Sequence, residues 1–112
     1  MASARVSRGR LTQRLVAEWF QVRGWPRAAS QPASLPGVDV LGMDGLSPEV
    51  KAKPGDVTGA LVQAHRNRGD GVPFVVWRPN GYGPERMSGW PVVFRLDDAT
   101  ELLRAAGYGE AE

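Results

Sequence analysis

The chain has 112 residues, 42% of them hydrophobic and 23% charged, a balance that favours a single globular domain over a disordered chain. It contains no cysteine, which excludes disulfides and thiolate zinc sites and leaves carboxylates as the metal ligands to look for. No apolar run approaches the length of about 20 residues that crosses a bilayer, and the N-terminus leads into no signal-peptide core, so we expect a soluble cytoplasmic protein.

Charge is distributed unevenly along the chain. Residues 1–30 hold six arginines against one acid, whereas residues 95–112 hold five acids against two arginines. Guanidinium groups bind phosphate bidentately, so the arginine-rich end favours a polyanionic partner, although a merely solvated helix face is the open alternative. The candidate DNA-binding side chains are Arg8, Arg10, Arg14, Arg27 and Lys53.

The first third of the chain predicts a helix followed by a loop. Apolar residues recur at three- and four-residue spacing over residues 10–23, which predicts a helix that ends at Gly24. Residues 26–36 are rich in Ala, Ser and Pro and follow neither the helical nor the strand period. This composition indicates a loop, with a short strand near Arg27.

The second half of the chain predicts alternating helices and strands. Residues 72–77 form a near-continuous apolar run, which is typical of a central strand covered on both faces. The other expected elements are a helix over about 56–68 with Asp56 as its N-cap, a strand over 90–96, and a last helix capped by Asp97 or Asp98 and stopped by Gly107. The element order predicts an α/β sandwich in one domain over residues 1–112, with a core of about residues 8–107.

Two short strands precede the second helix and bring acidic residues together. Strands are predicted over residues 38–41 and 47–52, and the glycines between them indicate a hairpin. If the turn is centred on Asp44, Asp39 lies directly opposite Glu49, since each is five positions from the centre. Opposed residues share one face of the sheet, so two carboxylates would lie within roughly 5 Å at Cβ.

The predicted pair needs a neutralising cation, because like charges at this spacing are destabilising. Mg²⁺ takes one or two carboxylates and keeps positions for water and phosphate oxygens. Lys51 is two residues from Glu49 and shares its face, where it can orient the attacking water or stabilise developing charge. Asp39 and Glu49 are therefore the candidate metal ligands, and an exposed strand edge is the alternative interpretation of the Glu49 and Lys51 pair.

The order of these pieces resembles the PD-(D/E)xK nuclease superfamily, whose restriction-endonuclease-like fold is an αβββαβ-type sandwich with a central mixed sheet flanked by helices. More closely, the chain resembles the Holliday-junction-resolvase branch, including short forms encoded by phages of actinobacteria, over about residues 8–107. The matching stretches are Arg8-Gly9, Gly24-Trp25, Arg27 with Ser30, Val38-Asp39-Val40, Glu49-Val50-Lys51 and Gly71 to Val76.

The resemblance implies a homodimer that uses Mg²⁺ or Mn²⁺ to cut branched DNA, in recombination or repair within a bacterial or phage-infected host cell. Asp39 and Glu49 would hold the metal, Lys51 would assist hydrolysis, and Ser30 would lie near the scissile phosphate. The expected activity is therefore that of a metal-dependent, structure-selective DNA endonuclease, most simply a Holliday junction resolvase.

One position departs from the pattern of these nucleases. Their first helix usually offers a glutamate to the site, and the matching residue here is Gln13. Glu18 lies five residues later, about 140° around the helix, so it cannot take the same place. An amide oxygen can still hold a metal-bound water, so Gln13 stays among the candidate catalytic residues.

Three alternatives are open from the sequence. A related virus-type replication and repair nuclease would have the same carboxylate and lysine core and a different DNA substrate. A catalytically weak or silent DNA-binding module would use the arginines while Gln13 marks a decayed site. A protein-interaction domain is the third alternative, which salt-dependent binding to DNA would eliminate.

Overall fold

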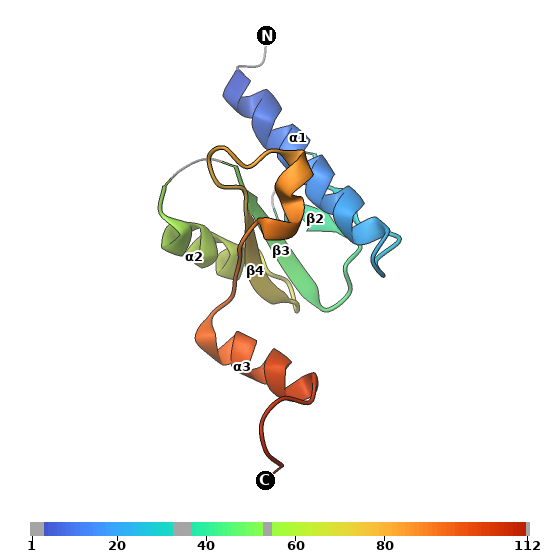
Figure 1. The fold of residues 1–112 in the computed structure, drawn as a ribbon, viewed down its shortest axis with the longest axis vertical. Helices are drawn as coiled ribbons and strands as arrows, with labels where there is room; N and C mark the ends of the chain where they lie inside the picture. Colours follow the sequence, from blue (N-terminus) through green and yellow to red (C-terminus); the bar gives the residue numbers. More distant parts are fainter. Residues whose placement is uncertain (1–3, 33–36, 53–54, 112) are drawn as a thin grey trace.

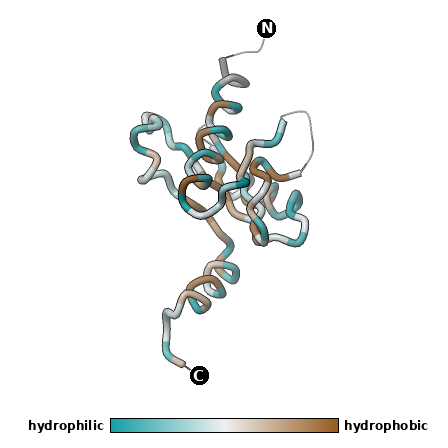
Figure 2. Tube along the Cα trace, turned by 90° about the vertical axis from the view of Figure 1, so that its right-hand side faces the viewer, coloured by the Kyte–Doolittle hydropathy of each residue, from teal (hydrophilic) through white to brown (hydrophobic). Residues whose placement is uncertain are grey.

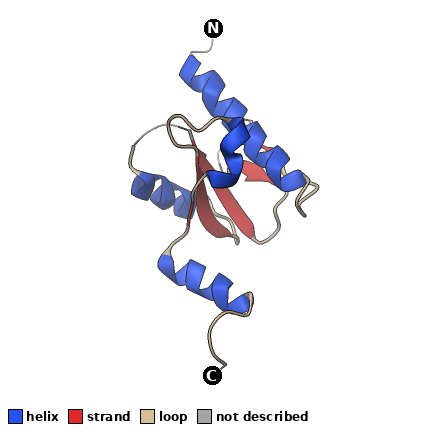
Figure 3. Cartoon of the chain, viewed as in Figure 1, coloured by secondary structure: helices blue, strands red, loops and turns tan. Residues whose placement is uncertain are grey.

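A mixed three-stranded sheet and an antiparallel pair of short strands lie among helices, so the protein is α/β (Figure 3). The computed structural model describes residues 4–32, 37–52 and 55–111, with side chains from Arg8 onward. The helices and strands are α1 (Ala4–Gln21), β1 (Ala29–Ser30), β2 (Val40–Leu41), β3 (Leu46–Lys51), α2 (Val57–Asn67), β4 (Val72–Trp77), the 3₁₀ helix η1 (Pro84–Gly89), β5 (Val92–Val93) and α3 (Leu96–Ala105).

Strand β4 is the centre of the three-stranded sheet, as its apolar run predicts. It pairs in parallel with β3 and antiparallel with β5. Val75 faces one core with Ala60 and Ala64 of α2, while Phe74 and Val76 face the other core, which includes residues of α1. Side chains that alternate between two covered faces explain why the strand is apolar at nearly every position.

The helices cover opposite faces of this sheet. Helix α2 connects β3 to β4 and packs on one face, whereas α1 lies with η1 on the other (Figure 1). Arg78, just after β4, ties this second layer together: it donates to the Thr12 hydroxyl at 3.1 Å and to the Tyr82 carbonyl at 2.9 Å. Thr12 is fully buried, so this guanidinium satisfies a polar group inside the α1 interface.

Several predicted elements are confirmed with shifted ends. Helix α2 has Asp56 as its N-cap, and the carboxylate accepts a hydrogen bond from the Thr58 N–H at 2.9 Å. Helix α1 begins six residues earlier than predicted, because Gly9 does not interrupt it. The predicted strand over 90–96 is reduced to Val92–Val93, and η1 replaces part of an expected loop.

The predicted cap of the last helix is wrong. The N-cap of α3 is Arg95, whose extended backbone precedes the helix without a side-chain cap. Asp97 and Asp98 lie inside the first turn instead, and the Asp97 carboxylate binds the Arg95 guanidinium at 3.0 Å. Gly107, with φ of 98°, follows the end of the helix as predicted.

The predicted hairpin is wrong as a strand ladder. Strand β2 pairs with β1, with Ser30 opposite Val40, and β3 pairs with β4. The chain just before β2 still approaches β3, through a hydrogen bond from the Asp39 N–H to the Pro48 carbonyl at 3.1 Å. The two predicted strands are therefore neighbours, but each forms its ladder with a different partner.

Helix α3 lies apart from the rest of the molecule in both views (Figures 1 and 2). None of its residues is buried, and Leu96, Leu102 and Leu103 are exposed. Within the described part of the chain, no helix combines the length and the apolar character that spanning a bilayer requires.

Two glycines have the same backbone conformation, but substitution by alanine should destabilise the protein by different amounts at the two positions. Gly42 and Gly45 have φ of 80° and 81°, and a Cβ at Gly42 would overlap the Arg27 carbonyl, whereas one at Gly45 meets nothing within 4 Å. Gly45→Ala should cost about 1–2 kcal/mol for the left-handed conformation alone. Gly42→Ala should cost a further 1–3 kcal/mol or so from the overlap, measured by urea unfolding. Equal losses would show that the approach of Arg27 to Gly42 is absent.

Candidate functional site

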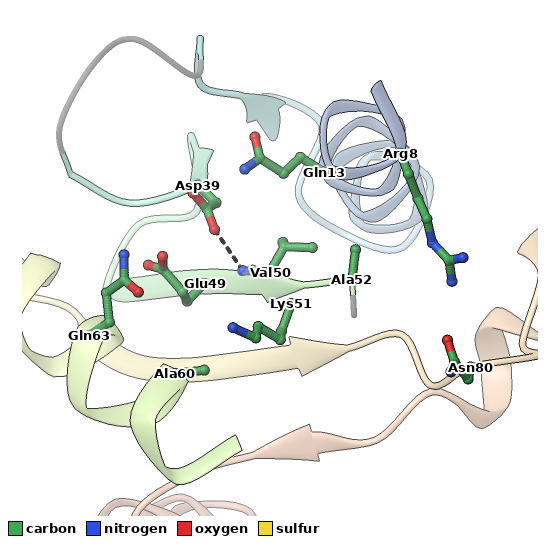
Figure 4. Close-up of a pocket in the computed structure, with 11 residues that line it drawn as sticks. Arg8, Gln13, Asp39, Glu49, Val50, Lys51, Ala52, Ala60, Gln63 and Asn80 are labelled. Carbon is green, nitrogen blue, oxygen red and sulfur yellow. Dashed lines mark hydrogen bonds between the residues drawn. The ribbon is translucent and has the colours of Figure 1, made fainter. Parts of the chain in front are cut away.

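A pocket of about 470 Å³ brings together residues from both helical layers and the edge of the sheet (Figure 4). Helix α1, strand β3 and helix α2 all contribute to it, together with the chain before β2 and the loop after β4. Its lining residues are Arg8, Gly9, Gln13, Asp39, Glu49, Val50, Lys51, Ala52, Ala60, Gln63 and Asn80. All four predicted catalytic residues, Gln13, Asp39, Glu49 and Lys51, are in this set.

Asp39 is fixed against the outer edge of β3 by two hydrogen bonds. Its N–H donates to the Pro48 carbonyl at 3.1 Å, and its carboxylate accepts from the Val50 N–H at 2.8 Å. Residues two apart on a strand direct their backbone groups to the same side, so these are the edge groups that β4 does not use. Asp39 binds these edge groups with its own N–H and its carboxylate. Its carboxylate therefore lies beside Glu49 although the two segments form no strand ladder.

Glu49 is buried at 7% exposure although it is an acid. Its carboxylate is in hydrogen-bond contact with Asp39 and with the side chain of Asn67 at the end of α2. The Oε2 atom of Glu49 is buried and has no hydrogen-bond partner among the residues that the structure describes. An unsatisfied buried carboxylate oxygen is costly in free energy, so this atom needs a proton or a cation.

Burial and mutual repulsion change the protonation of the pair. Burial, and next the nearby Asp39 charge, raise the pKa of Glu49 to about 7, although the Asn67 hydrogen bond and the Lys51 charge act to lower it. Burial also raises the pKa of Asp39, against the lowering effect of the Val50 N–H. Near neutral pH Glu49 is therefore protonated in part of the molecules, and a divalent cation bound by the pair would displace that proton.

The remaining predicted groups surround this pair. Lys51 and Glu49 both line the pocket, as expected for residues two apart on one strand (Figure 4). Gln13 lines it from α1. Glu18 is exposed and does not line the pocket, which agrees with its predicted rotation away from Gln13.

The predicted DNA-binding residues are only partly gathered at the pocket. Arg8 lines it, whereas Arg10 and Arg14 are exposed on α1 outside it. Arg27 lies away from it and pairs with Asp44 at 3.4 Å on the surface. Ser30 is half-buried in β1, outside the lining set, and Lys53 lies outside the described residues.

Three residues of this region did not emerge as site residues from the sequence. Gly9 lies one turn before Gln13 on α1, and a Cβ there would meet nothing within 4 Å, so it leaves the pocket open at that point. A glycine inside a helix costs about 1 kcal/mol relative to alanine. Gly9 lies directly before the helix predicted over residues 10–23, and this is the sequence feature that could have indicated a special role for it. Asn80 lies in a segment whose sequence is typical of a turn, and Asn67 lies where a helix is expected to end. Neither asparagine could therefore be distinguished from an ordinary structural residue.

The two carboxylates fit a cation that uses few protein ligands. Among the described residues, no group of three or more His, Cys, Asp or Glu side chains could hold a metal ion. Mg²⁺ does not require such a cage, because it commonly binds one or two carboxylates and completes its shell with water and phosphate oxygens. The unsatisfied Oε2 of Glu49 beside Asp39 meets that requirement.

Comparison with known proteins adds no assignment: no family model, no curated protein and no solved structure matches the chain.

The raised pKa of Glu49 predicts how stability changes with pH in metal-free protein. Between its ordinary value of 4.5 and about 7, the folded state binds more protons than the unfolded state, so the free energy of unfolding falls as pH rises through this window. We expect a loss of about 1–2 kcal/mol between pH 5 and pH 8, after allowance for solvent at the pocket mouth. Chemical unfolding in the presence of a chelator measures it.

Glu49→Gln should remove most of this pH dependence and should be more stable than the wild type at pH 8. Glu18→Gln changes an exposed acid on α1 and should keep the wild-type slope. A slope that persists unchanged in Glu49→Gln would assign it to other groups.

Proposed function

We propose that the protein is a metal-dependent DNA endonuclease of the PD-(D/E)xK type that acts on branched DNA, in the manner of a Holliday junction resolvase. The observation that carries the proposal is the meeting of Asp39, Glu49 and Lys51 in one pocket, where a buried Glu49 oxygen has no partner within the described part of the chain. The order of α1, the strands, α2 and β4 supports a restriction-endonuclease-like arrangement, in which this acidic edge is the active site.

Asp39 and Glu49 would hold Mg²⁺ or Mn²⁺, and Gln13 would accept a hydrogen bond from a water in the outer shell. A bound divalent cation would supply Lewis-acid stabilisation of the phosphate and a lower pKa for the attacking water. The Val50 N–H keeps the Asp39 carboxylate oriented, and Asn67 does the same for Glu49. The chain thus supplies a cation site whose ligands are fixed before DNA binds, which is a requirement for efficient electrostatic catalysis.

Lys51 supplies the positive charge that the protein itself contributes. It lines the same pocket, and its charge lowers the pKa of Glu49, so it acts on the carboxylate pair through space. In hydrolysis, its ammonium would orient the attacking water or stabilise the charge that develops on the phosphate.

DNA would approach from the side of α1. Arg8 and Asn80 line the pocket and can bind a phosphate oxygen. Gly9, which has no side chain, leaves space next to Arg8 for the DNA backbone. Arg10 and Arg14 lie farther along the same helix and are exposed, so they can bind neighbouring phosphates. A homodimer would present two such sites to the two strands of a junction.

Gln13 favours a second candidate, a DNA-binding module that hydrolyses slowly or not at all. Among the described residues that line the pocket, two are acids, and Gln13 matches the position at which the nucleases that the chain resembles usually have a glutamate. In that case the protein would bind branched DNA through its arginines without cutting it.

Cleavage of a labelled four-way junction, compared with linear duplex of the same sequence, tests the proposal in Mg²⁺ and in Mn²⁺. We expect symmetric nicks in the junction and a loss of at least about 100-fold in rate for Asp39→Asn, Glu49→Gln and Lys51→Ala. Asp44→Asn is the matched control, because Asp44 is an exposed acid in the adjacent turn and should leave the rate unchanged.

Gln13→Glu separates the two candidates. It adds a third carboxylate to the pocket and should lower the metal concentration needed for half-maximal cleavage. If the wild type binds the junction in a salt-sensitive way without cutting and Gln13→Glu cuts, the silent module is the correct description. If neither cuts or binds in either metal, the nuclease proposal is wrong, and cleavage of linear or flapped DNA alone would transfer the proposal to a related repair nuclease.

A further inference from the structure

Helix α3 presents an apolar face that none of the described residues of its own chain buries. Leu96, Ala99, Leu102, Leu103 and Ala106 fall within one arc of the helix, at spacings of three and four residues. Leu96 is 83% exposed and Leu103 is 54% exposed. The tube in Figure 2 shows these apolar segments on a helix that stands away from the body. A helix of this length is marginal in water without packing, so this face needs a partner.

An apolar groove on the body also has space for a side chain. Helix α1 contributes Val16, Trp19 and Phe20 to it, and the opposite side consists of Val76, Met87, Ser88, Trp90 and Val92. Its volume is about 140 Å³. A cavity of roughly 150 Å³ accommodates a group the size of benzene, so the groove has room for one leucine side chain.

We infer that α3 of one chain docks in the α1–η1 groove of a second copy, and that two copies exchange these helices reciprocally to form a closed dimer. Leu103 is the side chain expected in the groove, because it is an exposed leucine of the apolar arc near the C-terminal end of α3. Leu102 and Ala99 would lie against Val92, which is 47% exposed at the groove rim.

The charges of the two surfaces are complementary. Asp98 and Glu101 of α3 form no ion pair among the described residues. Arg23 stands at 3.3 Å over the Trp19 ring beside the groove and also has no acidic partner there. Docking would therefore bring the acidic side of α3 toward a guanidinium that contacts Trp19 and has no acidic partner among the described residues, which favours correct orientation more than affinity.

Exchange between two copies also determines the size of the assembly. The helix and the groove are different surfaces, so one contact alone would leave an open helix and an open groove at the ends and would propagate into a filament. Reciprocal exchange uses both surfaces of both chains and closes the assembly at two. The inference gives an interface to the dimer of the proposed function, but it involves neither DNA nor metal and does not depend on hydrolysis.

The chain has no cysteine, so single engineered cysteines can report the contact. Leu103→Cys and Ser88→Cys, carried on differently tagged chains and mixed, should form an intermolecular disulfide under mild oxidation. Thr58→Cys is the matched control for Ser88→Cys, because it is exposed on α2, far in sequence from the groove residues. Light scattering of the cysteine-free wild type should give twice the chain mass of 12.1 kDa. Leu103→Arg should weaken the dimer more than about tenfold, and any loss of helical signal should not exceed the contribution of α3 itself.

Several results would overturn the inference. A wild type that stays monomeric at high micromolar concentration would do so, as would equal cross-linking of Leu103→Cys to Thr58→Cys. Faster pairing of Leu103→Cys with itself would assign the interface to two α3 helices instead. A monomeric Leu103→Cys/Ser88→Cys double variant that forms its disulfide within one chain would show that α3 folds back on its own groove. Because no arm contains DNA, these outcomes are separate from failure of the nuclease assay.

Discussion

Two carboxylates held beside each other at low exposure are the constraint on which the site depends. Asp39 is fixed by backbone groups of Pro48 and Val50, and Glu49 is held by Asn67 and by its place in β3. Neither acid can turn away to solvent without losing these contacts, so the repulsion between them is relieved by a shared proton or by a cation. The raised pKa values of both acids are the consequence of this arrangement in the absence of metal.

The architecture supplies the remaining requirements of a cation site. Because β3 is an edge strand, its outer backbone groups are free for Asp39. On its other side β3, which carries Glu49, pairs with β4, a strand that is covered on both faces. Small residues leave the pocket open: Ala60 on α2 and Gly9 on α1 line it without filling it. The centre of the sheet is therefore packed on both faces, whereas the two carboxylates lie at its edge.

Local patterns in the sequence predict the parts of the fold that depend on neighbours along the chain. The apolar run of β4, the Asp56 cap and the shared face of Glu49 and Lys51 are of this kind. Counting outward from the turn also predicts that Asp39 lies near Glu49, but the contact arises from the hydrogen bonds of Asp39 with Pro48 and Val50 and not from the predicted ladder. The ladder partner of β2 and the contact of Asn67 with Glu49 depend on tertiary packing, which no local period encodes. Helix α3 illustrates the same limit, since its amphipathic pattern predicts a buried face and leaves open whether its own chain buries it.

The most direct test of this account is to locate Mn²⁺ in crystals of the protein at neutral pH by anomalous scattering. We expect one strong peak in contact with the carboxylates of both Asp39 and Glu49, absent in Glu49→Gln crystals grown under the same conditions. A wild-type map with no peak there, or with the ion bound elsewhere while the two carboxylates stay in mutual contact, would contradict the cation site and the nuclease function that rests on it.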